Sequence, residues 1–190
     1  LHVRGTGLLE LEEYERGLFS VQDEASTLAA DMLGAEPGET VIDVCAAPGG
    51  KTAAIGEMMD NRGKITAFDI YEHKLRIIEE QVRRLGIDIA ETDLTDGATG
   101  KDSLNGVADK VLSDVPCSGL GVIRRKPEIK YKEPEDLQTL YRLQGRILER
   151  SAKYLKPGGT LVYSTCTINR KENGAQTADC LLYTSDAADD

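Results

Sequence analysis

Thiol and carboxyl side chains occur where apolar segments of this sequence end. Asp114 and Cys117 follow one such segment, and Cys166 follows a later one. A cysteine thiolate is a strong nucleophile, and a nearby carboxylate can orient a substrate by hydrogen bonding. Most isolated cysteines are buried apolar residues, so a chemical role requires a loop that brings the thiol to a substrate. We therefore treat Cys117 and Cys166 as candidates for covalent chemistry.

A second candidate is the segment Asp43-Val-Cys-Ala-Ala-Pro-Gly-Gly-Lys-Thr52, which joins an apolar run to a predicted helix. Its adjacent glycines leave room for a ligand near the backbone, and the following helix start offers N–H groups and partial positive charge. Asp69 ends the next apolar run, where an acidic side chain commonly accepts hydrogen bonds from a ribose. Asp69 could instead be a helix cap. Together these residues predict a nucleoside site.

The ending Gly-Gly-Lys-Thr also resembles a P-loop, which binds nucleoside triphosphates. The full P-loop pattern needs a glycine where Cys45 stands, and Pro48 removes an N–H group from the phosphate cradle. A nucleoside without phosphates, such as S-adenosylmethionine, therefore fits better. A P-loop nucleotide hydrolase, with Lys51 and Thr52 at the phosphates and Asp114 at magnesium, is the alternative.

The elements that must position these residues alternate between strands and helices. Apolar runs predict strands at residues 40–45, 64–69, 87–92, 109–114 and 160–164. Such alternation predicts an α/β fold with a mostly parallel twisted sheet flanked by helices. Ligands bind beyond the carboxyl ends of parallel strands, so the polar residues at these ends should converge.

Apolar spacing also predicts three helices. One helix lies before residue 86 and presents Leu75, Ile78, Val82 and Leu85 to the sheet. A second runs from about residue 135 to 154. A third follows the capping signal Ser20-Val-Gln-Asp23 and continues through Leu33. Its predicted inner face consists of Val21, Ala25, Leu28 and Met32.

Two thiols at neighbouring strand ends fit one reaction beside S-adenosylmethionine. Carbon 5 of cytosine is a poor nucleophile, but a thiolate that adds to carbon 6 lets carbon 5 attack a sulfonium methyl group. The protein must then remove the carbon 5 proton and expel the thiol. Asp114-Val-Pro-Cys117 and Ser164-Thr-Cys166 carry groups suited to these steps.

Motifs at residues 19–26, 43–52, 114–127 and 163–166, together with Glu172-Asn173, occur in the order found in one family. The sequence resembles the catalytic domain of the RsmB/Sun-type RNA (cytosine-5)-methyltransferases. The resemblance implies a Rossmann-like fold and S-adenosylmethionine as cofactor. It implies RNA as substrate, with 16S ribosomal RNA expected and transfer RNA as the alternative. A non-catalytic RNA-binding scaffold is a further alternative.

The resemblance also implies roles for individual residues. Cys166 is expected to attack carbon 6, and Cys117 to assist proton removal or release. The residues alone do not rank the two thiols, because DNA cytosine methyltransferases attack with a Pro-Cys thiol. Lys51 and Asp114 are expected to orient the base, and Cys45 and Cys180 to be non-catalytic. The expected cofactor-binding residues are Cys45, Ala46, Ala47, Pro48, Gly49, Gly50, Lys51, Asp69, Asp93 and Asp114. Asp96 lies close to Asp93 and could replace it.

Basic residues crowd one segment after Cys117, namely Arg124, Arg125, Lys126, Lys130 and Lys132. We expect Arg124, Arg125 and Lys126 to bind RNA, although a solvated basic surface is the simpler interpretation. The net charge of −10 argues mildly against a nucleic-acid partner.

Composition limits the remaining possibilities. With 190 residues, 40% of them hydrophobic, the chain fits one domain. No long apolar run or signal peptide is present, so we expect a cytoplasmic monomer without a membrane segment. Four dispersed cysteines and two histidines predict no metal site.

The ends of the sequence depart from the family pattern. We expect residues 1–18 to be the remnant of a missing N-terminal region and residues 19–179 to form the methyltransferase domain. Residues 180–190 are expected to be a non-native tail. A sheet truncated at its C-terminal end would leave the strand at 160–164 partly exposed.

Overall fold

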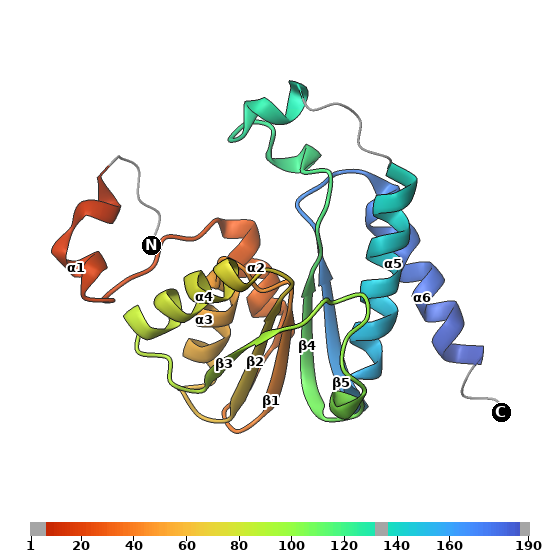
Figure 1. Ribbon diagram of the computed structural model, residues 1–190, viewed down its shortest axis with the longest axis horizontal. Helices are drawn as coiled ribbons and strands as arrows, with labels where there is room; N and C mark the ends of the chain where they lie inside the picture. The colour runs from red at the N-terminus through yellow and green to blue at the C-terminus, as the bar shows by residue number, and fades with distance from the viewer. Residues whose placement is uncertain (1–6, 132–136, 187–190) are drawn as a thin grey trace.

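A five-stranded parallel sheet forms the centre of the protein in the computed structural model, which describes residues 7–131 and 137–186 (Figure 1). The strand order is β3-β2-β1-β4-β5. The strands are β1 (Thr40–Val44), β2 (Lys64–Asp69), β3 (Ala90–Leu94), β4 (Ala108–Asp114) and β5 (Leu155–Ser164). The order reverses direction between β1 and β4, which is where doubly wound sheets bind ligands. The predicted α/β class is confirmed.

Helices cover both faces of the sheet, with α2, α3 and α4 on one side and α5 and α6 on the other (Figure 1). The long helices are α2 (Glu24–Leu33), α3 (Gly50–Met58), α4 (Glu72–Arg84), α5 (Leu137–Lys153) and α6 (Gly174–Asp186). The short ones are η1 (Leu8–Glu10), α1 (Glu12–Glu15), η2 (Asp102–Leu104), η3 (Leu120–Val122), η4 (Pro127–Tyr131) and η5 (Arg170–Glu172). The predicted start of α5 at residue 135 lies outside the described residues.

The core divides into layers because side chains of β1 alternate between the two faces of the sheet. Val41 packs with Leu33 and Ile55 on the α2 and α3 side, whereas Ile42 packs with Ile147 on the α5 side. Burying an aliphatic side chain of this size stabilises the fold by about 1.5–3 kcal/mol. This packing fixes the strand ends from which the site is built.

The strand and helix boundaries agree best with prediction near the centre of the sheet. The predicted β1, β2 and β4 are correct within one residue. Strand β3 begins at Ala90 rather than at residue 87, because Ile87 packs in the cluster formed with α4 before the strand starts. Strand β5 begins at Leu155 rather than at residue 160, since Leu155 already pairs with Ala108. The predicted apolar face of α4 is confirmed at Leu75, Ile78 and Val82.

The predicted inner face of α2 is wrong. Asp23 caps the helix as expected, because its carboxylate accepts a hydrogen bond from the Ala25 N–H at 3.0 Å. However, Leu28 is 57% exposed and Met32 67%, and Val21 and Ala25 are exposed as well. The buried residues are Ala29, Ala30 and Leu33. Small alanines let the helix approach the sheet closely, which the larger residues would prevent.

The edge strand β5 has no fully buried residue, which confirms the expected partial exposure of residues 160–164. Helix α6 runs from Gly174 to Asp186, so the predicted tail at 180–190 begins within a helix. Residues 187–190 lie outside the described part of the chain, and the domain boundaries at 18 and 179 stay predictions. None of the described helices is long and apolar enough to cross a membrane.

Candidate active site

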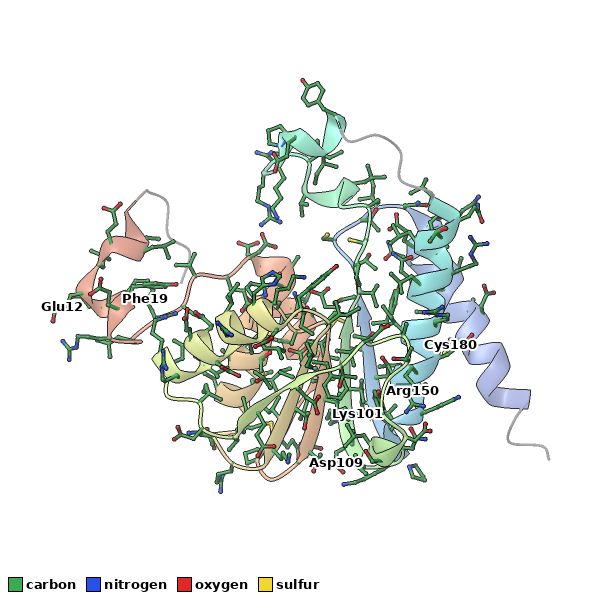
Figure 2. All side chains as sticks on the ribbon, in the orientation of Figure 1. Glu12, Phe19, Lys101, Asp109, Arg150 and Cys180 are labelled. Atoms are coloured by element: carbon green, nitrogen blue, oxygen red, sulfur yellow. The ribbon has the colours of Figure 1, made fainter. Side chains whose placement is uncertain are left out.

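The carboxyl ends of β1, β4 and β5 bring the candidate residues to one edge of the sheet. Asp109, at the start of β4, marks the opposite edge, and Cys180 lies apart on α6 (Figure 2). Among the described residues, three hollows that open at the carboxyl edge concern the site, with volumes of about 520, 270 and 200 Å³. Asp114 lines all three hollows, so it lies at the centre of the site.

The loop between β1 and α3 is shaped by unusual backbone conformations. Cys45 has φ 63° and Gly49 has φ 98°, a region that favours glycine. A β-carbon at Gly49 would lie 3.0 Å from the Ile78 Cα of α4. Gly49 is therefore needed for its backbone conformation and for helix packing, and its predicted place beside the cofactor stays a prediction. Gly50 lines the smallest hollow with Ala46, Ala47, Pro48 and Lys51.

The largest hollow connects the predicted cofactor residues to the thiols. It is lined by Asp69, Lys74 and Asp96 at one end and by Cys117 and Cys166 at the other. Asp69 is almost fully buried, and its carboxylate accepts a hydrogen bond from the Tyr71 N–H at 3.1 Å. A ligand of nucleoside size held at Asp69 would thus extend towards both sulfur atoms.

The structure places Asp93 outside the three hollows. Lys101 Nζ lies 2.6 Å from both carboxylate oxygens of Asp93, and Asp93 lines none of the three hollows. Asp96 lines the largest hollow instead, and its Oδ1 accepts a hydrogen bond from the Ala98 N–H at 2.8 Å. The reason is that β3 ends at Leu94, so the chain turns into the hollow only after Asp93.

Asp43 is a buried acid to which the sequence assigned no role. Its Oδ2 accepts a hydrogen bond from the Thr52 hydroxyl at 2.6 Å, while its Oδ1 has no hydrogen-bond partner among the described residues. Burial raises the pKa of Asp43 to about 7, against the opposing effect of the Thr52 hydrogen bond. Asp43 lines the smallest hollow, so the unpaired oxygen could accept a hydrogen bond from a bound cation.

Lys51 and Asp114 form an ion pair between the hollows. Lys51 Nζ lies 2.6 Å from Asp114 Oδ2, and the Ser164 hydroxyl donates to Asp114 Oδ1 at 2.7 Å. Both residues also line the hollow of about 270 Å³, together with Thr165 and Cys166. The pair offers an ammonium donor and a carboxylate acceptor beside the thiol, which suits a flat heterocycle that carries both kinds of group.

Cys117 and Cys166 lie in direct contact, with their sulfur atoms 2.7 Å apart. The Cys166 N–H also donates to Cys117 Sγ at 3.1 Å. The hydrogen bond from Cys117 lowers the pKa of Cys166 to about 7, whereas the same bond and burial raise the pKa of Cys117. Of the two thiols, Cys166 is therefore the one that ionises first.

The two other cysteines have the opposite electrostatic environment. Burial, followed by the charges of Asp69 and Asp43, raises the pKa of Cys45 to about 12. Burial and Glu149 raise the pKa of Cys180. Both are therefore protonated near neutral pH and poor nucleophiles. No group of three or more histidine, cysteine, aspartate or glutamate residues within 7–131 and 137–186 could hold a metal ion.

The basic segment follows Cys117, between η3 and η4, and lies beyond the carboxyl ends of the strands (Figure 1). Arg124, Arg125 and Lys126 are exposed, and Arg125 forms an ion pair with Asp23 and lines the hollow of about 270 Å³. Arg124 and Lys126 face solvent rather than this hollow. The side chain of Lys130 and all of Lys132 lie outside the described part of the structure.

Known structures define the class of the protein. The solved structure of NSun6 from Pyrococcus horikoshii with SFG is similar over 93% of this chain and 45% of that chain, with a TM-score of 0.83 and 34% identity. The fold is the Rossmann-like fold of S-adenosylmethionine-dependent methyltransferases. The structural similarity to these proteins extends over most of the chain, well beyond the loop after β1 and the thiol motifs.

The family is shown by sequence. The family model for 16S rRNA methyltransferase RsmB/F matches residues 30–189, and the chain belongs to this family. The probable ribosomal RNA small subunit methyltransferase B of Bacillus subtilis (strain 168) is 48% identical over 84% of this chain and 36% of its own length. The ribosomal RNA small subunit methyltransferase B of Vibrio vulnificus (strain YJ016) is 41% identical, over 92% and 41% respectively. The chain spans about two fifths of these relatives.

The cofactor of this class is S-adenosylmethionine, and the hollows fit it. Asp69 offers a carboxylate at the end of β2, where it can accept hydrogen bonds from the hydroxyl groups of a ribose. The unpaired Oδ1 of Asp43 offers an acceptor for an ammonium group. The hollow between them is lined by Cys45 and Ala47, so apolar atoms can pack against an aromatic base.

Proposed function

We propose that this domain transfers a methyl group from S-adenosylmethionine to carbon 5 of a cytosine in 16S ribosomal RNA, through a covalent adduct between Cys166 and the base. One observation carries the proposal: Cys166 lies on the wall shared by the cofactor-sized hollow and the hollow of Lys51 and Asp114. A thiolate at this position can reach a base on one side while a methyl donor lies on the other.

The first step is addition of Cys166 to carbon 6 of the base. The pKa of Cys166 near 7 makes about half of the thiol ionised at neutral pH. The bond between sulfur and carbon 6 places the electron pair of the ring on carbon 5. When bound, S-adenosylmethionine would supply an electrophilic methyl group for carbon 5, and the sulfonium sulfur would keep the electron pair of the broken bond as a neutral thioether. Cys166 thereby acts as a nucleophilic catalyst that is regenerated in the final step.

Lys51 and Asp114 orient the cytosine in the smaller hollow. Cytosine presents acceptors at N3 and O2 and a donor at its exocyclic amine, which match the ammonium of Lys51 and the carboxylate of Asp114. The ammonium also stabilises the negative charge that the ring gains when Cys166 adds. The distance of 2.6 Å between the two side chains keeps these complementary groups adjacent.

Cys117 completes the reaction as the base. While Cys166 is a thiolate, the hydrogen bond to Cys166, burial and the charge of Cys166 together raise the pKa of Cys117 and keep Cys117 protonated. Once Cys166 is bonded to carbon, that charge is gone and Cys117 can ionise more readily. Cys117 can then remove the carbon 5 proton, after which the bond between Cys166 and carbon 6 breaks and the methylated base leaves.

Arg124 and Lys126 hold the RNA backbone through their exposed charges.

Paired cysteine variants test the proposal. Cys166→Ala should reduce methylation of a 16S ribosomal RNA transcript by at least about 1,000-fold, measured by bisulfite sequencing. Cys117→Ala should accumulate a covalent complex with the RNA that survives denaturing gel electrophoresis. Cys180→Ala is the matched control and should behave like the wild type. A Cys117→Ala protein that releases RNA freely would contradict the division of roles, and preferential methylation of transfer RNA would overturn the substrate.

A further inference from the structure

The pair Glu172-Asn173 follows the Cys166 loop, and the mechanism above gives it no part. Glu172 ends η5 and is completely buried, with 0% exposure. A buried carboxylate is costly unless hydrogen bonds compensate for lost hydration, so its partners indicate why it is there. These partners come from three separate segments of the chain.

Glu172 accepts hydrogen bonds at both carboxylate oxygens. At Oε1 the donors are the Ser118 hydroxyl at 2.6 Å, the Asn169 Nδ2 at 3.0 Å and the Thr167 hydroxyl at 3.3 Å. At Oε2 the donors are the Ser118 N–H at 2.8 Å and the Gln144 Nε2 at 3.1 Å. A carboxylate is the only neutral-pH side-chain group that can accept all of these bonds without itself donating one.

The donors flank the two reactive thiols. Ser118 is the residue after Cys117, and Thr167 is the residue after Cys166. Gln144 of α5 additionally donates to the Pro116 carbonyl at 2.8 Å, directly before Cys117. Glu172 therefore connects the loop after β4 to the loop after β5 at positions adjacent to each sulfur atom.

We propose that Glu172 is a positioning residue, whose buried carboxylate holds the Cys117 and Cys166 loops at the separation that lets Cys117 donate a hydrogen bond to Cys166. This inference rests on the proposed function, because it assigns the pair of thiols to catalysis. Its geometric part concerns only the thiols and can be measured without RNA. Glu172 itself touches no reacting atom.

The charge of Glu172 is maintained by its surroundings. Burial alone would raise its pKa, but the hydrogen bonds from Ser118, Gln144 and Asn169 outweigh this effect and hold the pKa below its usual range. A glutamine at this position would replace one carboxylate oxygen with an NH₂ group. That group would face hydrogen-bond donors, so at least one donor would lose its acceptor. The loops would then separate or rotate, and a thiol pair 2.7 Å apart tolerates little displacement.

The two loops also share contacts that do not involve Glu172. The Gly121 N–H donates to the Cys166 carbonyl at 3.0 Å, and the Ser118 and Thr167 hydroxyls lie 2.8 Å apart. The Val115 N–H donates to the Ser164 carbonyl at 3.1 Å, where β4 and β5 end. These bonds should keep Glu172→Gln folded, so that the substitution changes thiol geometry rather than the whole domain.

Thiol reactivity provides the test. The rate of Cys166 alkylation by iodoacetamide is measured as a function of pH, with mass spectrometry to identify the labelled peptide. Asp114 and Lys126 also influence Cys166 and are kept unchanged. In Glu172→Gln the apparent pKa of Cys166 should rise from about 7 towards the ordinary thiol value, and the alkylation rate at pH 7 should fall roughly tenfold. Ser118→Ala, which removes one donor, should shift the pKa in the same direction by less.

The control separates positioning from stability. Ile65→Val removes one methylene group from the core at the amino end of β2, far from the thiols. It should lower the melting temperature without moving the pKa of Cys166. In methylation assays Glu172→Gln should lower kcat about 100-fold and leave the affinity for S-adenosylmethionine unchanged.

Different failures have different meanings. An unchanged Cys166 pKa in both Glu172→Gln and Ser118→Ala would overturn the positioning role, whatever the change in melting temperature. If the pKa shifts but even the wild type never methylates RNA, the thiol geometry stands and the proposed function fails. If Glu172→Gln does not fold, the Ser118→Ala pH profile decides the question.

Discussion

The two halves of the site are built in different ways. The cofactor half is centred on a strand, a tight loop and a helix start that are contiguous in sequence, with Asp43, Cys45 and Gly50 within a few residues of one another, and Asp69 and Asp96 join it from later strand ends. The thiol half is formed by two irregular loops that are brought together from distant parts of the chain. Only the first half is therefore fixed by local backbone geometry.

The two halves therefore differ in the contacts that fix the positions of their residues. In the cofactor half, positive φ angles and close helix packing fix the loop. In the thiol half, buried polar contacts to Glu172 take the place of regular secondary structure. Such a network is sensitive to single substitutions, because each lost partner leaves a buried polar group unsatisfied.

The largest effect in the cofactor half is expected at Asp43. Its folded pKa of about 7 exceeds the unfolded value of 3.8, so the folded state binds more protons between these values. Stability should therefore fall as pH rises from about 4 to 7, by on the order of 4 kcal/mol, and then level off. The Asp43→Asn variant has no carboxyl group at this position, so its stability should not show this fall. Urea unfolding of both proteins across this range measures it, and parallel pH profiles would disprove it.

Asp69 should have an intermediate effect confined to cofactor binding. Asp69→Ala removes a buried acceptor that lines the largest hollow, so the affinity for S-adenosylmethionine should fall about 10- to 100-fold in calorimetry. Asp93→Ala is the matched control, because Lys101 binds that carboxylate away from the hollow. Equal losses in the two variants would show that Asp93 also belongs to the cofactor half.

The smallest expected effect is a difference in thiol reactivity between Cys45 of the cofactor half and Cys166 of the thiol half. Alkylation of Cys166 should become about tenfold faster between pH 6 and pH 8, because its pKa is about 7. Cys45, with a pKa of about 12, should stay unlabelled over the same range. Peptide mapping after iodoacetamide treatment distinguishes the two. If Cys45 and Cys166 were labelled at similar rates, the proposed difference in thiol ionisation between the two halves would be wrong.

The same contrast explains what could be predicted from sequence. The strands β1, β2 and β4 and the thiol pair followed from apolar runs and motif spacing. Asp93 was chosen over Asp96 because the sequence does not show where β3 ends relative to the hollow. The inner face of α2 was misassigned because two apolar stripes are present, and only packing against α3 and the sheet selects the alanine stripe.

The Glu172 network could not be predicted for a related reason. Its donors are Ser118, Gln144, Thr167 and Asn169, and no periodicity links these positions. Hydrogen-bond partners that are far apart in sequence depend on how strands are ordered in the sheet. The Glu172-Asn173 motif contributed to the family resemblance, but the sequence does not show which groups the Glu172 carboxylate binds.

The contacts around Glu172 also determine how this end of the molecule fluctuates. The amides of Ser118, Gly121 and Cys166 each donate a hydrogen bond to the opposite loop or to Glu172. Opening one loop therefore breaks bonds of the other, and the two should open as one cooperative unit. In native-state hydrogen exchange these amide protons would exchange with a common opening free energy, unlike the independent fluctuations usual for surface loops.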